Sequence, residues 1–286
     1  PVFVDVDEAT LNIDPKKIEA AITSKTKAIM VVHFAGLACE MDEIKKIAEK
    51  HKLFLLEDAA HALPTSYNKR IIGNDTSDAT IFSFYATKTI TTGEGGMIVT
   101  SNSKIAERCK IMRLHGISRD VFDRYTAKGS KWYYEIVAPG QKCNMTDIAA
   151  CIGIEQLKKA DRFAKKRKEI AHKYLEAFKN LPITLPSDSK NGDIHSWHLF
   201  VIRLKENSKM NRESFISKMN DFGIGCSVHF IPLHLHPFWQ ESLSVKEGDF
   251  PVAEKVFNNA ISLPIYTKMS DADVDRVINA VKEILC

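Results

Sequence analysis

Short apolar runs alternate with amphipathic segments along the first half of the chain. Apolar residues spaced three and four positions apart over 41–51 predict a helix. Asp14 and Pro15 form an N-cap and first-turn pair for another helix, which we expect to end at Ala21. The predicted strands are 2–6, 27–33, 53–56, 79–84 and 97–100. This alternation predicts an α/β sheet covered by helices on both faces.

The pattern changes in the second half of the chain. From Thr146 to about Phe178 it is helical, and a loop containing prolines follows. Beyond the loop we expect a strand, a helix, a strand and a helix, over 197–204, 212–222, 225–230 and 271–285. The sequence therefore predicts a large domain over 1–170 and a smaller α+β domain over 171–286.

Composition excludes several classes of protein. The 286 residues are 44% hydrophobic, enough for a large core, and the net charge of +4 is spread along the chain, so no nucleic-acid partner is expected. The longest apolar runs fall far short of the roughly 20 residues of a membrane-spanning helix. The six cysteines form no CxxC pair, which predicts reduced thiols and a cytoplasmic protein.

Two acids and a histidine follow the apolar strand in LLEDAAH, where ligands bind in open α/β sheets. Glu57 and Asp58 point in opposite directions on a strand, so we expect at most one of them to face a site. A second group is Ser83 to Lys88 in SFYATK, where Ser83 ends another strand and Lys88 lies in the loop that follows. An amine, a hydroxyl and a distant acid are what pyridoxal phosphate requires of a protein.

These segments resemble a known family. SFYATKTITTGEGGMIVTS and LLEDAAHAL are similar to the lysine segment and the pyridinium-binding segment of the DegT/DnrJ/StrS nucleotide-sugar aminotransferases. The resemblance extends through RLHGISRD, PGQKCNMTDIAACIGIEQLKKAD, HFIPLHLHPF and ISLPIY, and so covers essentially the whole chain. It implies a fold of the aspartate-aminotransferase type (fold type I), with a smaller C-terminal domain.

The resemblance also implies roles for individual residues. Lys88 would form the Schiff base with pyridoxal 5′-phosphate and move the proton, and Asp58 would hold the pyridine nitrogen protonated. Ala60 would pack on one ring face and His61 would lie near the phenolic oxygen. Ser83 would bind the phosphate.

A further implied residue is Lys142, which would reach the cofactor phosphate of a neighbouring subunit, so that the resemblance implies a homodimer with shared sites. Gln141 and Cys143 stand where the family usually has aromatic residues, which leaves the packing of this loop open. The chain starts at Pro1, without the glycine-threonine phosphate-binding turn that the family carries upstream. We therefore expect an N-terminally truncated large domain.

The reaction expected from the resemblance is transfer of an amino group from an amino acid, glutamate by preference, to a keto sugar linked to a nucleotide, for surface polysaccharide or related amino-sugar biosynthesis. Dehydratases of the family have histidine in place of Lys88, which argues against that activity. A non-catalytic member retained for assembly or regulation is the alternative. No metal site is expected, although His234 and His236 have the spacing of a ligand pair.

Overall fold

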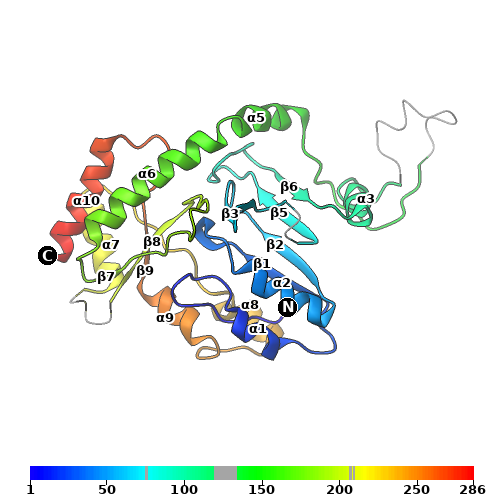
Figure 1. Ribbon diagram of the computed structural model, residues 1–286, viewed down its shortest axis with the longest axis horizontal. Helices are drawn as coiled ribbons and strands as arrows, with labels where there is room; N and C mark the ends of the chain where they lie inside the picture. Colours follow the sequence, from blue (N-terminus) through cyan, green and yellow to red (C-terminus); the bar gives the residue numbers. More distant parts are fainter. Residues whose placement is uncertain (75–76, 119–133, 206–207, 209) are drawn as a thin grey trace.

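The chain folds around two larger sheets and one short hairpin (Figure 1). The computed structural model describes residues 1–74, 77–118, 134–205, 208 and 210–286. Its strands are β1 (Ala28–Val32), β2 (Phe54–Asp58), β3 (Ser66–Tyr67), β4 (Arg70–Ile71), β5 (Ala79–Ser83), β6 (Gly96–Val99), β7 (Ile183–Thr184), β8 (Phe200–Leu204) and β9 (Ala260–Leu263). Of the predicted motif RLHGISRD, Arg119 and Asp120 lie outside the described residues.

Helices connect and cover these strands. They are α1 (Pro15–Ala21), α2 (Met41–His51), α3 (Ser103–Met112), α5 (Asp147–Leu157), α6 (Ala160–Phe178), α7 (Arg212–Asp221), α8 (Pro237–Leu243), α9 (Pro251–Asn259) and α10 (Asp271–Leu285), with short 3-10 turns η1 (Phe34–Gly36) and η2 (Leu233–Leu235). None of those formed by the described residues has the length and apolar character needed to cross a membrane.

The larger sheet has the strand order β1-β2-β5-β6, in which the first three strands are parallel and β6 is antiparallel. Helix α2 connects β1 to β2 and occupies the predicted residues 41–51. Its buried residues Met41, Ile44 and Ala48 form one stripe that packs with Ile29 and Leu55 of the sheet. Because β1, β2 and β5 are parallel, their carboxyl ends meet at one edge of the sheet.

The expectation that helices cover both faces of this sheet is wrong for the described residues. Side chains of β1 and β2 alternate between buried and exposed positions: Ile29 and Leu55 are buried, whereas Met30, Val32 and Phe54 are 55%, 46% and 54% exposed. The four residues of β6 are all exposed. One face therefore packs on α1 and α2, and the other presents apolar side chains to solvent.

Two predicted strands do not form. Residues 2–6 run extended, but their only ladder contact among the described residues is the bridge from Val6 to Ile13. Residues 225–230 likewise make a single bridge, from Ser227 to Ser262. Both segments have strand-like sequences, but a strand also requires a partner along its length, which the fold does not provide here.

The second sheet, β7-β8-β9, is antiparallel and carries the core of the C-terminal half. Helices α6, α7 and α10 supply most of its partners, including Tyr174, Phe215 and Val277, which are buried with Phe200 and Ile261 of the sheet. The predicted domain boundary after residue 170 falls within α6, and that division stays a prediction.

Hydrogen bonds to the side chain of Asp5 connect the N-terminal segment to the C-terminal half. The buried Asp5 carboxylate accepts hydrogen bonds from the backbone N–H groups of Val252 (3.2 Å) and Ala253 (3.0 Å), at the start of α9. Lys17 lies 3.1 Å from the same carboxylate. Burial alone would raise the pKa of Asp5, but the hydrogen bond from the N–H of Val6 at 2.9 Å, together with those from Ala253, Lys17 and Val252, outweighs it and lowers the pKa. Asp5 thus caps a helix that begins far along the chain.

Replacing Asp5 by alanine should destabilise the fold by about 1–2 kcal/mol, the usual cost of losing a helix cap. Because the folded state lowers this pKa, the stabilisation is present above the pKa of the unfolded chain and is lost as pH falls through the folded pKa. Urea unfolding of both proteins should therefore show a difference at pH 7 that shrinks below about pH 4. A difference that is absent, or constant with pH, would contradict the capping role.

Candidate active site

The candidate site lies where β2 and β5 end. Asp58 is the last residue of β2, Ser83 is the last of β5, and Lys88 follows in the turn, where its backbone N–H donates to the carbonyl of Tyr85 at 3.0 Å. Lys88 is partly buried. Burial lowers the pKa of its amine, and the carboxylate of Asp58 acts in the opposite direction. The structure therefore places the predicted amine and the predicted acid within electrostatic reach of each other.

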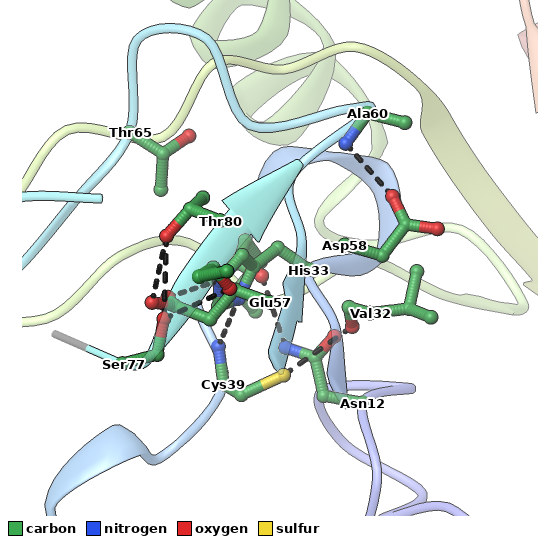
Figure 2. Close-up of polar contacts among 12 residues, drawn as sticks. Asn12, Val32, His33, Cys39, Glu57, Asp58, Ala60, Thr65, Ser77 and Thr80 are labelled. Carbon is green, nitrogen blue, oxygen red and sulfur yellow. Dashed lines mark hydrogen bonds and ion pairs between the residues drawn. The ribbon is translucent and has the colours of Figure 1, made fainter. Parts of the chain in front are cut away.

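The two adjacent acids of β2, Glu57 and Asp58, lie in different surroundings, and Figure 2 shows the side chain of Asp58 turned away from that of Glu57. Glu57 is fully buried and bonded to His33, whose Nε2 lies 2.8 Å from its Oε2. Asp58 is partly exposed, and its Oδ1 accepts a hydrogen bond from the N–H of Ala60 at 2.9 Å. Only Asp58 is thus available to a ligand on the Lys88 side.

His61 is buried beside these groups. Its ring lies against that of His198, with centroids 4.2 Å apart and the planes tilted by 32°, and its carbonyl accepts a hydrogen bond from Ser196 Oγ at 2.5 Å. Burial, the charge of Lys88 and the neighbouring His229 together lower the pKa of His61 to about 3. The imidazole is therefore neutral at pH 7, with only one ring nitrogen protonated.

His198 was not predicted from the sequence, and it comes from the C-terminal half, just before β8. Burial is the main cause that lowers its pKa to about 2, and coupling to His61 and the positive charges of Arg167 and Lys88 add to the effect. Arg167 of α6 fixes this segment, because its Nη1 donates to the carbonyls of Trp197, His198 and Ile265 at 3.0–3.2 Å. A histidine in front of a strand gives no sequence signal for such a role.

Among the described residues, two buried imidazole nitrogens remain without a hydrogen-bond partner, Nδ1 of His61 and Nδ1 of His198, as do Nε1 of Trp197 and Nε of Arg167. Buried polar atoms in folded proteins nearly always have partners. Both imidazole rings lie in contact with each other and within the electrostatic reach of Lys88. The two imidazole nitrogens therefore indicate a place where a ligand or water supplies the missing hydrogen bonds.

Three other predicted residues are placed differently. Ser83 Oγ accepts from the N–H of Tyr85 at 3.3 Å, and Ala60 is partly buried next to Asp58. Lys142 is exposed, forms a bridge to Leu114 and bonds Asn144, neither of which belongs to the group around Lys88. Lys88 is therefore within electrostatic reach of Asp58 and His61 in one chain, whereas the contacts described above for Ala60 and Ser83 are local and none of them reaches Lys142.

Three of the histidines that could suggest a metal have other partners. His33 contacts Glu57, His229 Nδ1 lies 2.8 Å from Ser262 Oγ, and His234 Nε2 lies 2.8 Å from Glu254 Oε1. No group of three or more potential ligands is gathered in the part of the chain that the structure describes.

Comparison with known proteins identifies the family. A model of the DegT/DnrJ/EryC1/StrS aminotransferase family matches residues 1–282. The chain belongs to this family. It is 55% identical over its full length to an uncharacterized protein of Methanocaldococcus jannaschii, of which it spans 74%. It is 48% identical over 287 aligned positions, its whole length, to the spore coat polysaccharide biosynthesis protein SpsC of Bacillus subtilis, of which it spans 73%.

Solved structures of the family share the fold. A putative sugar aminotransferase of Streptococcus pneumoniae in its PMP form matches 99% of the chain, which covers 75% of that protein, with a TM-score of 0.91 and 32% identity. The PLP form of the same protein gives a TM-score of 0.88 and 31% identity over 100% of this chain and 76% of that one. The chain is a sugar aminotransferase that depends on pyridoxal 5′-phosphate.

The residues at the strand ends fit this cofactor. The carboxylate of Asp58 and the hydroxyl of Ser83 lie at the ends of adjacent strands, and the Lys88 amine, with its lowered pKa, follows in the turn. The buried Nδ1 of His61 has no hydrogen-bond partner among the described residues and could bond a ligand. This donor set corresponds to what the aldehyde, the pyridine nitrogen and the phosphate each require.

The lowered pKa of Lys88 should be measurable without the cofactor. An amine reagent added to the cofactor-free protein should modify Lys88 with a rate that rises to its plateau at lower pH than for solvent-exposed lysines, because only the neutral amine reacts. Peptide mapping after short labelling at several pH values measures this. In Asp58→Asn, which loses the opposing carboxylate charge, the midpoint should fall further. A Lys88 midpoint at or above the usual lysine value of about 10.4 would contradict this description of the site.

Proposed function

We propose that this enzyme moves an amino group from an amino acid, glutamate by preference, to a keto group of a nucleotide-linked sugar. The amino-sugar product would serve surface polysaccharide or related amino-sugar biosynthesis, as the name of the Bacillus subtilis relative suggests for that protein. The observation that carries the proposal is the convergence of Lys88 and Asp58 at the ends of neighbouring strands. When bound, pyridoxal phosphate supplies the carbonyl that accepts the amino group and a ring that withdraws electrons.

Lys88 is the proposed catalytic residue. When pyridoxal phosphate is bound, the Lys88 amine would hold its aldehyde carbon and would move a proton at the reacting carbon of the substrate. Burial lowers its pKa and so increases the fraction of neutral amine available to act as nucleophile and base. The neutral imidazoles of His61 and His198 add no further positive charge at pH 7.

Asp58 holds the proton of the pyridine nitrogen in this proposal. A carboxylate within hydrogen-bond distance favours the protonated ring, which accepts electrons best. The hydrogen bond from Ala60 N–H fixes one carboxylate oxygen and leaves the other available. Ala60 would pack on one ring face, His61 would contact the phenolic oxygen, and Ser83 would bind the phosphate.

Lys142 is proposed to bind the cofactor phosphate of a neighbouring subunit in a homodimer. Its exposed position, apart from the group around Lys88, is compatible with a role between subunits. The helix that follows supports an interface, because Ile148, Ile154 and Leu157 of α5 are 79%, 57% and 59% exposed. Apolar side chains gathered on one exposed helix are typical of surfaces that another chain covers.

We propose that the enzyme works in the cytoplasm, where its six free cysteines would stay reduced. The alternative of a non-catalytic member has no support in the structure, since the amine and the carboxylate lie together. A dehydratase of the family would need histidine at position 88, where this chain has lysine.

Borohydride reduction of the enzyme loaded with pyridoxal phosphate should attach the cofactor to Lys88, because reduction makes the bond between amine and aldehyde permanent. Peptide mapping by mass spectrometry locates the adduct. Lys88→Ala should lose the adduct and at least about 10⁴-fold in amino transfer from glutamate, since the covalent partner and the base disappear together, while keeping its circular dichroism spectrum.

Lys25, an exposed lysine, offers a matched control, and Lys25→Ala should keep both the adduct and the activity. An adduct on any other lysine, or normal turnover by Lys88→Ala, would show that the assignment is wrong.

A further inference from the structure

A buried group of polar side chains lies behind Asp58, on the opposite side of β2 (Figure 2). Glu57 and His33 are both completely buried, with the His33 Nε2 atom 2.8 Å from Glu57 Oε2. The second carboxylate oxygen, Oε1, accepts a hydrogen bond from Thr80 Oγ1 at 3.2 Å. These hydrogen bonds link three neighbouring parallel strands: His33 follows directly after β1, Glu57 lies near the end of β2, and Thr80 lies near the start of β5.

The direction of these hydrogen bonds follows from the backbone. The N–H of Cys39 donates to His33 Nδ1 at 3.1 Å, so that nitrogen carries no proton. The ring proton is therefore on Nε2 and is donated to Glu57. Both oxygens of Glu57 act as acceptors, and each nitrogen of His33 has a defined partner. The group is satisfied in this one arrangement.

His33 also holds the main chain of Asp58. Its backbone N–H donates to the carbonyl of Asp58 at 3.1 Å, one position beyond the last β1–β2 pair, Val32 and Asp58. Across β2, Glu57 pairs with Thr80 in the register of β5. His33 thus holds Glu57 through its side chain and Asp58 through its backbone N–H.

We propose that Glu57, His33 and Thr80 are positioning residues that hold the Asp58 carboxylate in register with Lys88. This inference rests on the proposed role of Asp58. A shift of the end of β2 would leave buried donors of His33 and Thr80 without acceptors, which is costly. An apolar group of the same size would fill the space without this directional constraint.

Glu57→Leu removes both acceptors and should reproduce the effects of Asp58→Asn. The readouts are the dissociation constant of pyridoxal phosphate, from absorbance titration, and the ratio of the two absorbance bands of the bound cofactor at fixed pH. We expect the dissociation constant to rise about tenfold, as for one charge-assisted hydrogen bond. The band ratio should move in the same direction as in Asp58→Asn, and the double variant should add nothing to Asp58→Asn alone.

Glu57→Gln is the conservative rescue. Its amide oxygen can accept from His33, and its amide N–H can donate to Thr80 Oγ1, which then donates to Ser77 Oγ at 3.3 Å. The variant should therefore keep the wild-type spectrum. If Glu57→Leu does not fold, Thr80→Val removes one donor at nearly unchanged shape, and a smaller shift of the band ratio in the same direction is expected.

Leu55→Ala provides the matched control for lost stability. Leu55 is buried, two residues before Glu57 on the same face of β2, and is bonded to neither His33 nor Thr80 through its side chain. This variant should lower the melting temperature without changing the band ratio.

The outcomes separate the two proposals. If Asp58→Asn changes the spectrum but Glu57→Leu behaves like Leu55→Ala, the positioning role is wrong and the proposed function stands. If Glu57→Gln shifts the spectrum as much as Glu57→Leu, the charge of Glu57 acts rather than its hydrogen bonds, and the positioning account is overturned. If Asp58→Asn itself changes nothing, the role of Asp58 fails, and the inference fails with it.

Discussion

Successive side chains of a β-strand point to opposite faces, and the site depends on this constraint at the end of β2. Glu57 and Asp58 are neighbours in sequence, yet one is fully buried against His33 and the other faces Lys88. The parallel arrangement of β1, β2 and β5 then gathers the ends of three strands at one edge of the sheet. A carboxylate positioned by the core can thus meet an amine supplied by the turn after the next strand in the sheet.

Burial controls the charge of the groups around Lys88. It lowers the pKa of the Lys88 amine and of the neighbouring imidazoles of His61 and His198, so that positive charge is disfavoured throughout the group. Among the described residues, Asp58 is the acid whose charge acts against this trend at Lys88. The resulting pair, a reactive amine and a single carboxylate, suits a cofactor that needs a nucleophile at one end and an anion at the other.

Local patterns predicted the elements that depend on local interactions. Helices α2 and α10 have the predicted bounds, and Asp14 caps α1, because periodicity and caps are encoded in neighbouring residues. The strands expected at 2–6 and 225–230 fail because ladder partners are a property of the whole fold.

The same distinction applies to the site. The segments LLEDAAHAL and SFYATK identified candidate residues close in sequence to the strand ends. They did not identify His198 and Arg167, which lie far from these segments in the sequence. These two reach the site only through the packing of α6 against the segment before β8. The apolar alternation of the strands in the larger sheet also does not show by itself whether a second layer covers the exposed face.

A crystal structure of this chain with pyridoxal phosphate tests the central claim most directly. The account predicts that Lys88 Nζ is bonded to the aldehyde carbon while a carboxylate oxygen of Asp58 lies about 2.7–3.0 Å from the pyridine nitrogen. A cofactor joined to Lys88 with its pyridine nitrogen more than about 4 Å from Asp58 would contradict it.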